Sequence, residues 1–251
     1  DNKKILIPPA VTISSKTKPE TIKENQYPII AKPQTGHAKV DVNLINNPDE
    51  MKNFISSHPV QNFVFEQYVA GDEIICAGII HEKKYYHVLM SDKKTTGLPY
   101  FADILHTTPS VHQELITSTV ETGQAITEAF NIQTSPLIME FILSPEGKLY
   151  LLEAVPEFGG EFIPDIMIPA ATGYNHIENA IKAISSYDFK VPHKIPMNNA
   201  VAVKYLAGED GILTSCNTDS VTVMDNIIFS RIFKDIGAKV SPPLTNHDRI
   251  G

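Results

Sequence analysis

The segment from Leu137 to Val155 constrains the fold most, because its pattern predicts a β-hairpin that carries two carboxylates. Two apolar stretches, Leu137–Leu143 and Lys148–Val155, flank the turn-forming sequence SPEG at 144–147. Runs of this length, bounded by proline and glycine, are typical of antiparallel strands that are joined by a short turn. The hairpin therefore fixes a local register, and the register decides which side chains share a face.

Glu140 and Glu153 are diagonal neighbours on one face of this predicted hairpin. With a four-residue turn, Glu140 pairs with Leu151, and Ile138 pairs with Glu153. Residues that are paired, or two apart in a strand, share a face, so the two glutamates lie roughly 7–8 Å apart. A register shifted by one residue would separate them. The other residues on this face are all apolar: Ile138, Ile142, Leu149, Leu151 and Val155.

Two carboxylates on an apolar face need a partner, because each loses hydration and they repel one another. A shared proton or a bound cation would relieve the repulsion. Oxygen ligands suit Mg²⁺, which needs few protein carboxylates when phosphates supply the remaining ligands. The alternative interpretation is a pair of solvent-facing glutamates on an edge strand, which fits the apolar neighbours poorly. The hairpin thus indicates a metal-bridging role as one of two interpretations.

Composition and missing motifs exclude several classes of protein. The chain has 251 residues, enough for one large domain or two small ones, and its formal net charge of −8 disfavours nucleic-acid binding. No stretch approaches the ~20 apolar residues of a membrane span. The two cysteines, Cys76 and Cys216, lie far apart, so we expect no disulfide framework or zinc ribbon, and a cytoplasmic location. The GxxxxGK[ST], GxGxxG and GxSxG motifs are absent.

The rest of the chain mixes helices and strands. Asn47 followed by Pro48 predicts a helix N-terminus, with about three turns to Ser57. Alternation predicts a strand at Asn62–Val69 and a hairpin formed by Glu73–Ile80 and Tyr85–Met90. Helical spacing predicts a long helix over Pro109–Phe130. The expected fold class is α+β.

At this point five segments, taken in order, give the chain a family resemblance. They are YPIIAKP at 27–33, VFEQYVAGDE at 64–73, MEF at 139–141, LYLLEAVPEFGGEFIPD at 149–165 and ATG at 171–173. Together they resemble the ATP-grasp superfamily, and in particular the branch of carbamoyl-phosphate-synthase-like chains and amino-acid ligases. Each motif alone is weak, whereas their order and spacing are fairly specific.

The resemblance implies an ATP-grasp fold, in which two α+β subdomains clasp a nucleotide. It implies a lid subdomain at 1–67, a core subdomain with the metal site at 68–190, and a β-rich extension at 191–251. Family enzymes use ATP and Mg²⁺ to activate a carboxylate as an acyl phosphate, which an amine then attacks. Since the chain opens at Asp1 without a Met, we expect it to be the ATP-grasp part of a longer protein.

The resemblance also implies a set of nucleotide-binding residues. Lys32 would contact the phosphates, and Glu66 would accept a hydrogen bond from the adenine amino group. The backbone of Gln67 and Val69 would read the adenine edge, and Glu73 would hold the ribose hydroxyls. Considered alone, Lys32 is also typical of a lysine at a strand end, and Glu66 and Glu73 of solvated strand residues.

Glu140 and Glu153 would hold Mg²⁺ against the β- and γ-phosphates. The loop Thr35–Val42 would fold over those phosphates. The protein would contribute positioning and charge neutralisation, as in other phosphoryl transfers. The expected partners are a small-molecule carboxylate and an amine, with no nucleic acid and no membrane. The resemblance assigns no catalytic residue, substrate or oligomeric state.

The sequence departs from the family pattern at four positions. Val155 replaces an asparagine that usually supplies a metal ligand, and Glu157 replaces an arginine that holds an anion. Ile138 stands where amino-acid ligases often have a histidine, and Gly36 is the only glycine of the phosphate loop. These departures support an alternative, an ATP-binding pseudoenzyme or regulatory subunit. A structural protein that binds no nucleotide would leave the two glutamates without a partner.

Overall fold

A computed structural model describes residues 5–13, 22–58, 62–185, 189–192, 194–217 and 224–251. These residues form two compact units. The first, called the six-stranded unit here, contains the described residues up to Ile7 together with Ala70–Lys94 and Leu105–Val203. The second, the four-stranded unit, contains Pro8–Val69, Thr95–Ile104 and Lys204–Gly251. Each unit is described by itself below.

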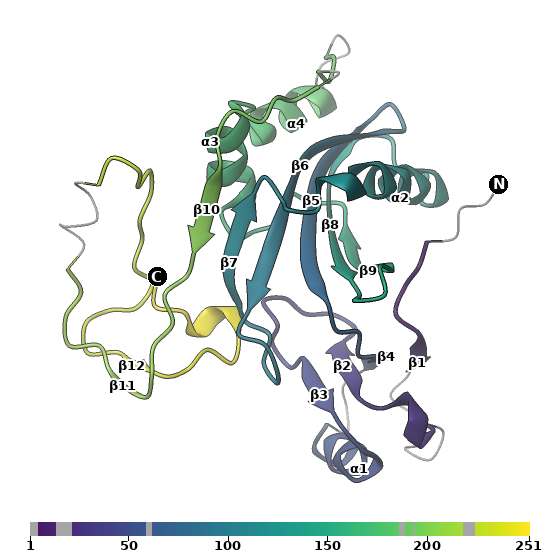
Figure 1. The fold of residues 1–251 in the computed structure, drawn as a ribbon, viewed down its shortest axis with the longest axis vertical. Coiled ribbons are helices and arrows are strands. Elements are labelled where there is room, and N and C mark those ends of the chain that lie inside the picture. Colours follow the sequence, from purple (N-terminus) through teal and green to yellow (C-terminus); the bar gives the residue numbers. More distant parts are fainter. Residues whose placement is uncertain (1–4, 14–21, 59–61, 186–188, 193, 218–223) are drawn as a thin grey trace. The chain divides into compact units, whose positions relative to one another are not determined.

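The first unit is built on a sheet with the strand order β10-β7-β6-β5-β8-β9. Its long central strands are antiparallel and adjacent, as Figure 1 shows for β6, β5 and β8. The strand bounds are β5 Asp72–His81, β6 Lys84–Thr95, β7 Asp103–Thr108, β8 Ser135–Leu143, β9 Leu149–Val155 and β10 Val201–Lys204. The β5–β6 hairpin turns at Glu82 and Lys83, which both have positive φ, as a tight hairpin turn requires.

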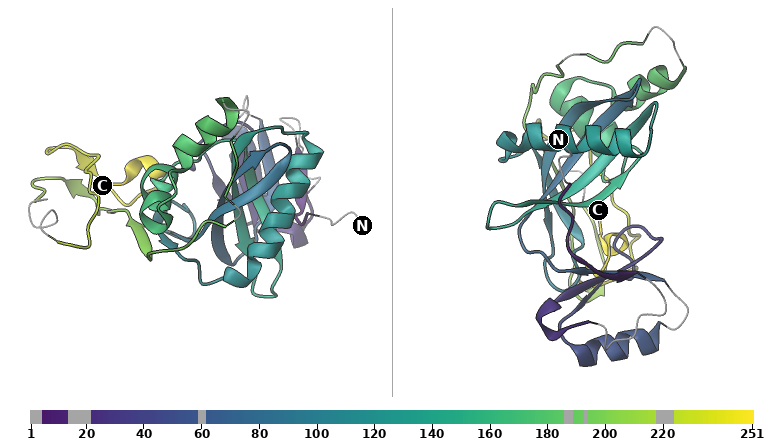
Figure 2. Two further views of the ribbon diagram at one scale, coloured as in Figure 1. Left: turned by 90° about the horizontal axis from the view of Figure 1, so that it is seen from above. Right: turned by 90° about the vertical axis from the view of Figure 1, so that its right-hand side faces the viewer.

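Helices cover both faces of this sheet. The helix α2 (Ile116–Ala129), preceded by the short 3₁₀ helix η3 (Gln113–Leu115), packs on the face that carries Ile74, Cys76 and Ile80. On the opposite face, the π-helical turn η4 (Ile163–Met167), α3 (Ile168–Thr172) and α4 (His176–Ser185) pack on Ile75, Ala77 and Ile79. Figure 2 shows α2 on one side of the sheet and α3 and α4 on the other. The alternation of the β5 side chains between the two cores follows from the pleat.

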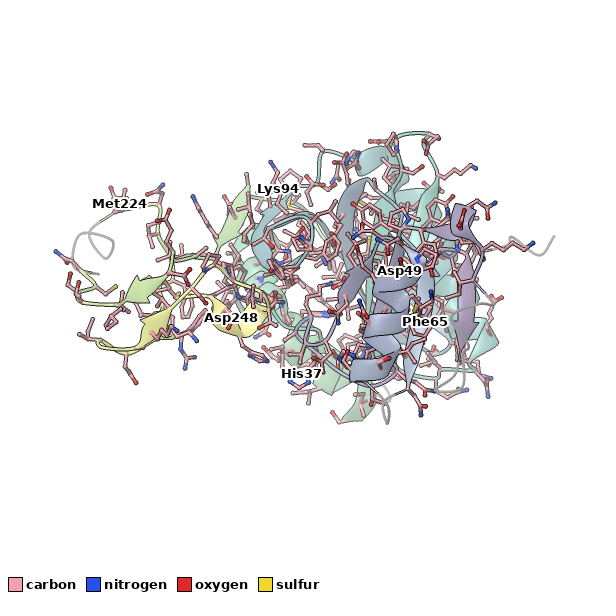
Figure 3. The ribbon with its side chains drawn as sticks, turned by 90° about the horizontal axis from the view of Figure 1, so that it is seen from below. His37, Asp49, Phe65, Lys94, Met224 and Asp248 are labelled. Atoms are coloured by element: carbon pink, nitrogen blue, oxygen red, sulfur yellow. The ribbon has the colours of Figure 1, made fainter. Side chains whose placement is uncertain are left out.

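The second unit contains a sheet with the strand order β1-β4-β2-β3. Its strands are β1 Ala10–Ile13, β2 Ile29–Pro33, β3 Asn43–Ile45 and β4 Phe63–Gln67. The helix α1 (Pro48–Ser57) covers one face, where Met51 and Phe54 pack on Phe63 and Phe65. Figure 3 shows α1, marked by Asp49, lying over the strand that carries Phe65. The remaining elements of the unit are η2 (Glu24–Gln26), β11 (Gly211–Ile212), β12 (Lys239–Val240) and η5 (Asn246–Asp248).

Several local predictions are confirmed, and one helix is shorter than expected. Asn47 caps α1 by accepting hydrogen bonds from the backbone N–H groups of Asp49 and Glu50. The predicted helix over Pro109–Phe130 is wrong in its first turns, because α2 begins only at Ile116. The Asp92 carboxylate accepts hydrogen bonds from the Ser110 hydroxyl and the Val111 N–H, which holds this entry segment in a non-helical conformation. Within the described part of the chain, no helix combines the length and the apolar character that crossing a membrane requires.

Candidate functional site

Four charged side chains lie on one face of the six-stranded sheet, each from a different strand. Glu73 of β5 pairs directly with Lys93 of β6, and Glu140 of β8 pairs directly with Glu153 of β9. Ile75 pairs with Glu140 in one direction and with Ser91 in the other, so the two charged pairs occupy adjacent rows of the same face. The sheet therefore gathers three carboxylates and one ammonium group in one region.

The hairpin register differs from the predicted one, although the two glutamates do lie together. Leu143 pairs with Leu149 and not with Lys148, so the turn is one residue longer than expected. A β-bulge between Glu140 and Phe141 shifts the register by one more residue, and Glu140 then faces Glu153 directly. A total shift of two residues leaves each side chain on its predicted face. The two carboxylates therefore still share a face, but as directly opposite and not diagonal neighbours.

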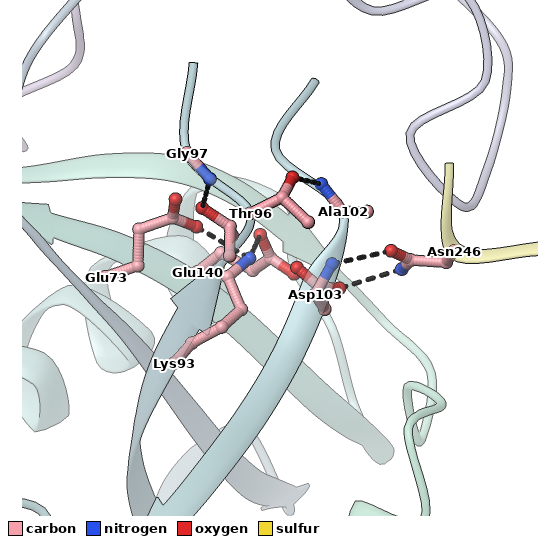
Figure 4. A network of polar contacts seen from close by, with 9 residues as sticks. Glu73, Lys93, Thr96, Gly97, Ala102, Asp103, Glu140 and Asn246 are labelled. Carbon is pink, nitrogen blue, oxygen red and sulfur yellow. Dashed lines mark hydrogen bonds and ion pairs between the residues drawn. The ribbon is translucent and has the colours of Figure 1, made fainter. Parts of the chain in front are cut away.

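Lys93 is the functional residue that the sequence reasoning missed. Its Nζ lies 2.8 Å from Oε2 of Glu73 and 2.8 Å from Oε2 of Glu140 (Figure 4). The Lys93 side chain is fully buried (0% exposed), while the two glutamate side chains are 17% and 21% exposed. The predicted hairpin ended at Met90. Extending its pairing would have placed Asp92 opposite Glu73, and a β-bulge between Ala77 and Gly78, which the sequence pattern does not show, shifts the register so that Lys93 takes that place.

The arrangement fits a divalent cation. The three carboxylates and the Lys93 ammonium have a formal charge sum of −2, which one divalent ion would neutralise. All the side-chain atoms that Glu140 and Glu153 offer are carboxylate oxygens, the ligands that Mg²⁺ prefers. In the same row as Glu140, the buried Ser91 hydroxyl has no hydrogen-bond partner among the described residues. A buried polar atom without a partner is typical of a place where a ligand or water binds.

Two of the family departures are packed into the apolar core next to this cluster. Ile138 pairs directly with Val155, one row away from the glutamate pair. Ile138 is buried in the core cluster on this face, and Val155 packs against that cluster. Gly159, which has a φ of +74°, approaches Ile138 so closely that any added Cβ would clash with the Ile138 side chain. The row formed by Ile138 and Val155, next to the two carboxylates, is therefore apolar and supplies no further metal ligand.

Lys32 and Glu66 form an ion pair of their own in the four-stranded unit. Lys32 lies on β2 and Glu66 on β4, with Nζ and Oε2 2.5 Å apart. In the β2–β4 register Ile30 pairs with Glu66 and Lys32 with Val64, so the two charged side chains are diagonal neighbours on one face. The Lys32 side chain is 31% exposed and the Glu66 side chain 18% exposed. The predicted phosphate and adenine contacts of these residues stay predictions.

Two backbone N–H groups that follow Glu66 already donate hydrogen bonds within the protein. Gln67 donates its backbone N–H to the carbonyl of Pro9, and Tyr68 donates its own to the carbonyl of Pro28. The hinge role of Gln67 and Val69 stays a prediction.

The predicted phosphate loop, Thr35–Val42, bends without the usual glycines. Ala38, Lys39 and Asp41 adopt left-handed conformations with φ of 56°, 64° and 57°. Non-glycine residues reach this region at a cost, which surrounding contacts must offset. One such contact comes from the C-terminal segment, where Asn246 donates its backbone N–H to the Ala38 carbonyl.

The predicted site residues thus fall into two sets. Glu73, Glu140 and Glu153 lie together in the six-stranded unit. Lys32, Glu66, Gln67 and Val69 belong to the four-stranded unit, where Lys32 contacts Glu66. The chain connects the sets directly, since the first unit resumes at Ala70.

Comparison with known proteins links these features to a family. A family model described as the ATP-grasp domain matches residues 25–165, more than half of the chain. A search of curated proteins gives no match.

Solved structures resemble the chain over most of its length. An L-amino acid ligase from Bacillus licheniformis is 17% identical with a TM-score of 0.77, over 95% of this chain and 59% of that one. A biotin carboxylase from Campylobacter jejuni is 17% identical with a TM-score of 0.67, over 82% of this chain and 48% of that one. An N5-carboxyaminoimidazole synthetase from Staphylococcus aureus, solved with ADP, is 16% identical with a TM-score of 0.65, over 82% and 53%.

The chain thus spans about half to three fifths of the length of these structures. The family match and the structural likenesses confirm the α+β ATP-grasp fold that the sequence predicts.

Proposed function

The chain belongs to the ATP-grasp domain family, and from this premise we propose that it is the ATP-grasp part of a carboxylate–amine ligase. In this proposal ATP and Mg²⁺ supply the phosphoryl group and the charge neutralisation that convert a carboxylate into an acyl phosphate. An amine then displaces the phosphate. Structural neighbours solved with ADP, and one solved with MgADP and bicarbonate, support the choice of ATP and Mg²⁺.

The observation that carries the proposal is the direct pairing of the half-buried Glu140 with the exposed Glu153, which leaves the carboxylates open to a cation from the solvent side. Two opposed carboxylates repel one another, and a divalent cation between them removes that repulsion. Glu140 and Glu153 would hold Mg²⁺, and Glu73 would hold the ribose hydroxyls. In the other unit, Lys32 would bind the phosphates, which requires it to exchange its contact with Glu66 for a contact with the nucleotide.

The substrates are proposed only by class: a small carboxylate and an amine. The neighbours include a ligase for L-amino acids and an enzyme that acts on an aminoimidazole, so the family supports chemically different acceptors. The exposed Glu157 stands where relatives hold an anion, which is compatible with a cationic amine. The three predicted subdomains, the absence of nucleic-acid and membrane partners and the cytoplasmic location belong to the same proposal.

A titration calorimetry experiment tests nucleotide binding. The wild-type chain should bind a non-hydrolysable ATP analogue in the presence of Mg²⁺, and the Glu140→Gln/Glu153→Gln variant should bind it at least tenfold more weakly. Glu146→Gln, in the turn of the same hairpin, is the matched control and should bind like wild type. The absence of binding by a folded wild-type chain would overturn the proposal.

A second candidate function is an ATP-binding pseudoenzyme or regulatory subunit. The packing of Val155 against the apolar core supports it, because the position that usually adds a metal ligand contributes only a hydrocarbon side chain. It predicts nucleotide binding without ADP release across a panel of carboxylates and amines. Turnover that appears only in Val155→Asn/Glu157→Arg would favour this second function, and turnover by the wild-type chain would exclude it.

A further inference from the structure

We propose that Lys93 is an exchangeable counter-ion for Glu140. It holds the Glu140 carboxylate when no divalent cation is bound, and it gives up this carboxylate, while keeping Glu73, when the cation binds. The inference rests on the proposed function, because it takes Glu140 to be a metal ligand. It goes further by assigning a role to a lysine that none of the predicted site residues includes.

The position of Lys93 carries the first step of the argument. An ammonium group that is fully buried loses its hydration, and its carboxylate partners must replace that hydration. Lys93 has such partners in Glu73 and Glu140, with both contacts at 2.8 Å. Both partners are more exposed than the lysine itself, so a cation could reach the Glu140 carboxylate from the solvent side.

Charge gives the second step. Lys93 already uses Oε2 of Glu140, one of the two oxygens that the residue offers to a metal. Two positive ions on one carboxylate repel one another strongly in a partly buried site. Metal binding therefore weakens the contact between Lys93 and Glu140, and the same repulsion makes Lys93 a competitor for the metal.

The contact with Glu73 gives the third step, because it lets Lys93 remain paired after the exchange. Glu73 is directly opposite Lys93 on the neighbouring strand, and the four-carbon lysine stem can adjust without backbone movement. No bare buried charge is then left in either state. Glu73 and Glu140 thus act as alternative partners for a single ammonium group.

Manganese binding without nucleotide tests this competition. We measure Mn²⁺ affinity by electron paramagnetic resonance of the free ion, for the wild-type chain and for Lys93→Met, which keeps most of the stem and removes the charge. Loss of the competitor should tighten Mn²⁺ binding about tenfold. An unchanged or weaker affinity in a folded Lys93→Met chain would overturn the proposal.

The variant Glu73→Gln provides a test of opposite sign that does not require removal of the buried lysine. With its alternative partner made neutral, Lys93 should hold Glu140 more tightly, and Mn²⁺ affinity should fall several-fold. Asp72→Asn, which removes one negative charge from the adjacent residue on the other face of β5, is the matched control and should change the affinity less. Equal effects of Glu73→Gln and Asp72→Asn would contradict the proposal.

The variant Glu140→Gln separates this inference from the proposed function. If Mn²⁺ binding by the otherwise wild-type chain does not depend on Glu140, the assigned metal role itself fails. If binding depends on Glu140 but Lys93→Met leaves it unchanged, only the counter-ion role of Lys93 fails. Lys93→Met combined with Glu140→Gln should lose the gain that Lys93→Met alone produces. Lys182→Met, at an exposed lysine on α4 of the same unit, should leave Mn²⁺ affinity unchanged.

Discussion

The two units each hold a lysine against a glutamate, and the two arrangements differ in burial and in partner number. Lys93 is fully buried between Glu73 and Glu140. Lys32 is 31% exposed and contacts Glu66. A solvated pair gains little from its Coulomb energy, whereas a buried ammonium depends on its carboxylates for all the stabilisation that water would otherwise supply. The two units therefore differ in the lysine: Lys32 keeps part of its hydration beside Glu66, whereas Lys93 depends on its two glutamates.

Lys93 also has the more enclosed surroundings of the two lysines. Lys93 lies on β6, in the interior of a sheet that has helices on both faces. Lys32 lies near the end of β2, immediately before the predicted phosphate loop, whose shape depends on contacts from the C-terminal segment. The same two residue types thus form a network around a buried lysine in one unit and a partly exposed pair in the other.

Removal of each lysine in turn should reveal the largest difference in stability between the two sites. Lys93→Met leaves two carboxylates without their buried cation and should lower the free energy of unfolding by about 3–5 kcal/mol. Lys32→Met should lower it by about 1 kcal/mol or less. Urea unfolding in the presence of EDTA measures both values. Similar losses for the two variants would contradict the interpretation of Lys93 as a buried counter-ion.

Acid should destabilise the six-stranded unit through two buried histidines. Burial lowers the pKa of His87 and that of His176 from 6.5 to about 4. Above pH 6.5 both are neutral in either state, and stability is fully present. As the pH falls from 6.5 towards 4, the unfolded chain gains protons before the folded chain does, so stability falls, by roughly 2 kcal/mol per histidine and roughly 4 kcal/mol in all at pH 5. Urea unfolding at pH 7 and pH 5 measures the loss.

The variant His176→Phe provides the control for this pH dependence. His176 is 1% exposed and contacts the rings of Phe158 and Tyr174, so a phenyl ring retains much of its packing. The acid-induced loss should then fall by about half, because one of two titrating groups is gone. An identical pH dependence in His176→Phe would contradict the assignment.

In the four-stranded unit, Asn246→Ala should destabilise the loop that follows Lys32. The Asn246 amide accepts from the Asp103 N–H and donates to the Asp103 carboxylate, both at 2.8 Å (Figure 4). Its loss leaves buried polar groups without this partner and should cost about 1–3 kcal/mol. Hydrogen exchange should accelerate across 35–42, because the Asn246 backbone also binds the Ala38 carbonyl. Asn179→Ala, on α4 of the six-stranded unit, should not accelerate it.

The smallest expected effect concerns the opposed glutamates. In the absence of divalent ions, Glu153→Gln removes one of two like charges that face each other and should raise the free energy of unfolding by about 0.5 kcal/mol. Added Mg²⁺ should stabilise the wild-type chain more than this variant. A variant that loses stability without metal would show that repulsion is not the dominant interaction of Glu153.

Short-range patterns were sufficient for several features. The cap at Asn47, the helix that follows it and the hairpin that carries Glu140 and Glu153 depend on residues within about a dozen positions of one another. The order of the family motifs predicted the ATP-grasp fold, which the family match confirms. Even the hairpin register was wrong in detail, because neither the longer turn nor the bulge after Glu140 leaves a mark in strand alternation.

The sequence by itself therefore determined that two carboxylates share a face and which fold carries them. Only the tertiary structure decided which groups from distant parts of the chain contact these carboxylates and the rest of the site. Lys93 is 47 residues from Glu140, and Asn246 is 143 residues from Asp103. Such pairs depend on which strands become neighbours and on where the chain returns. Alternation and capping report on local geometry alone, whereas burial of a charge is decided by every segment that packs around it.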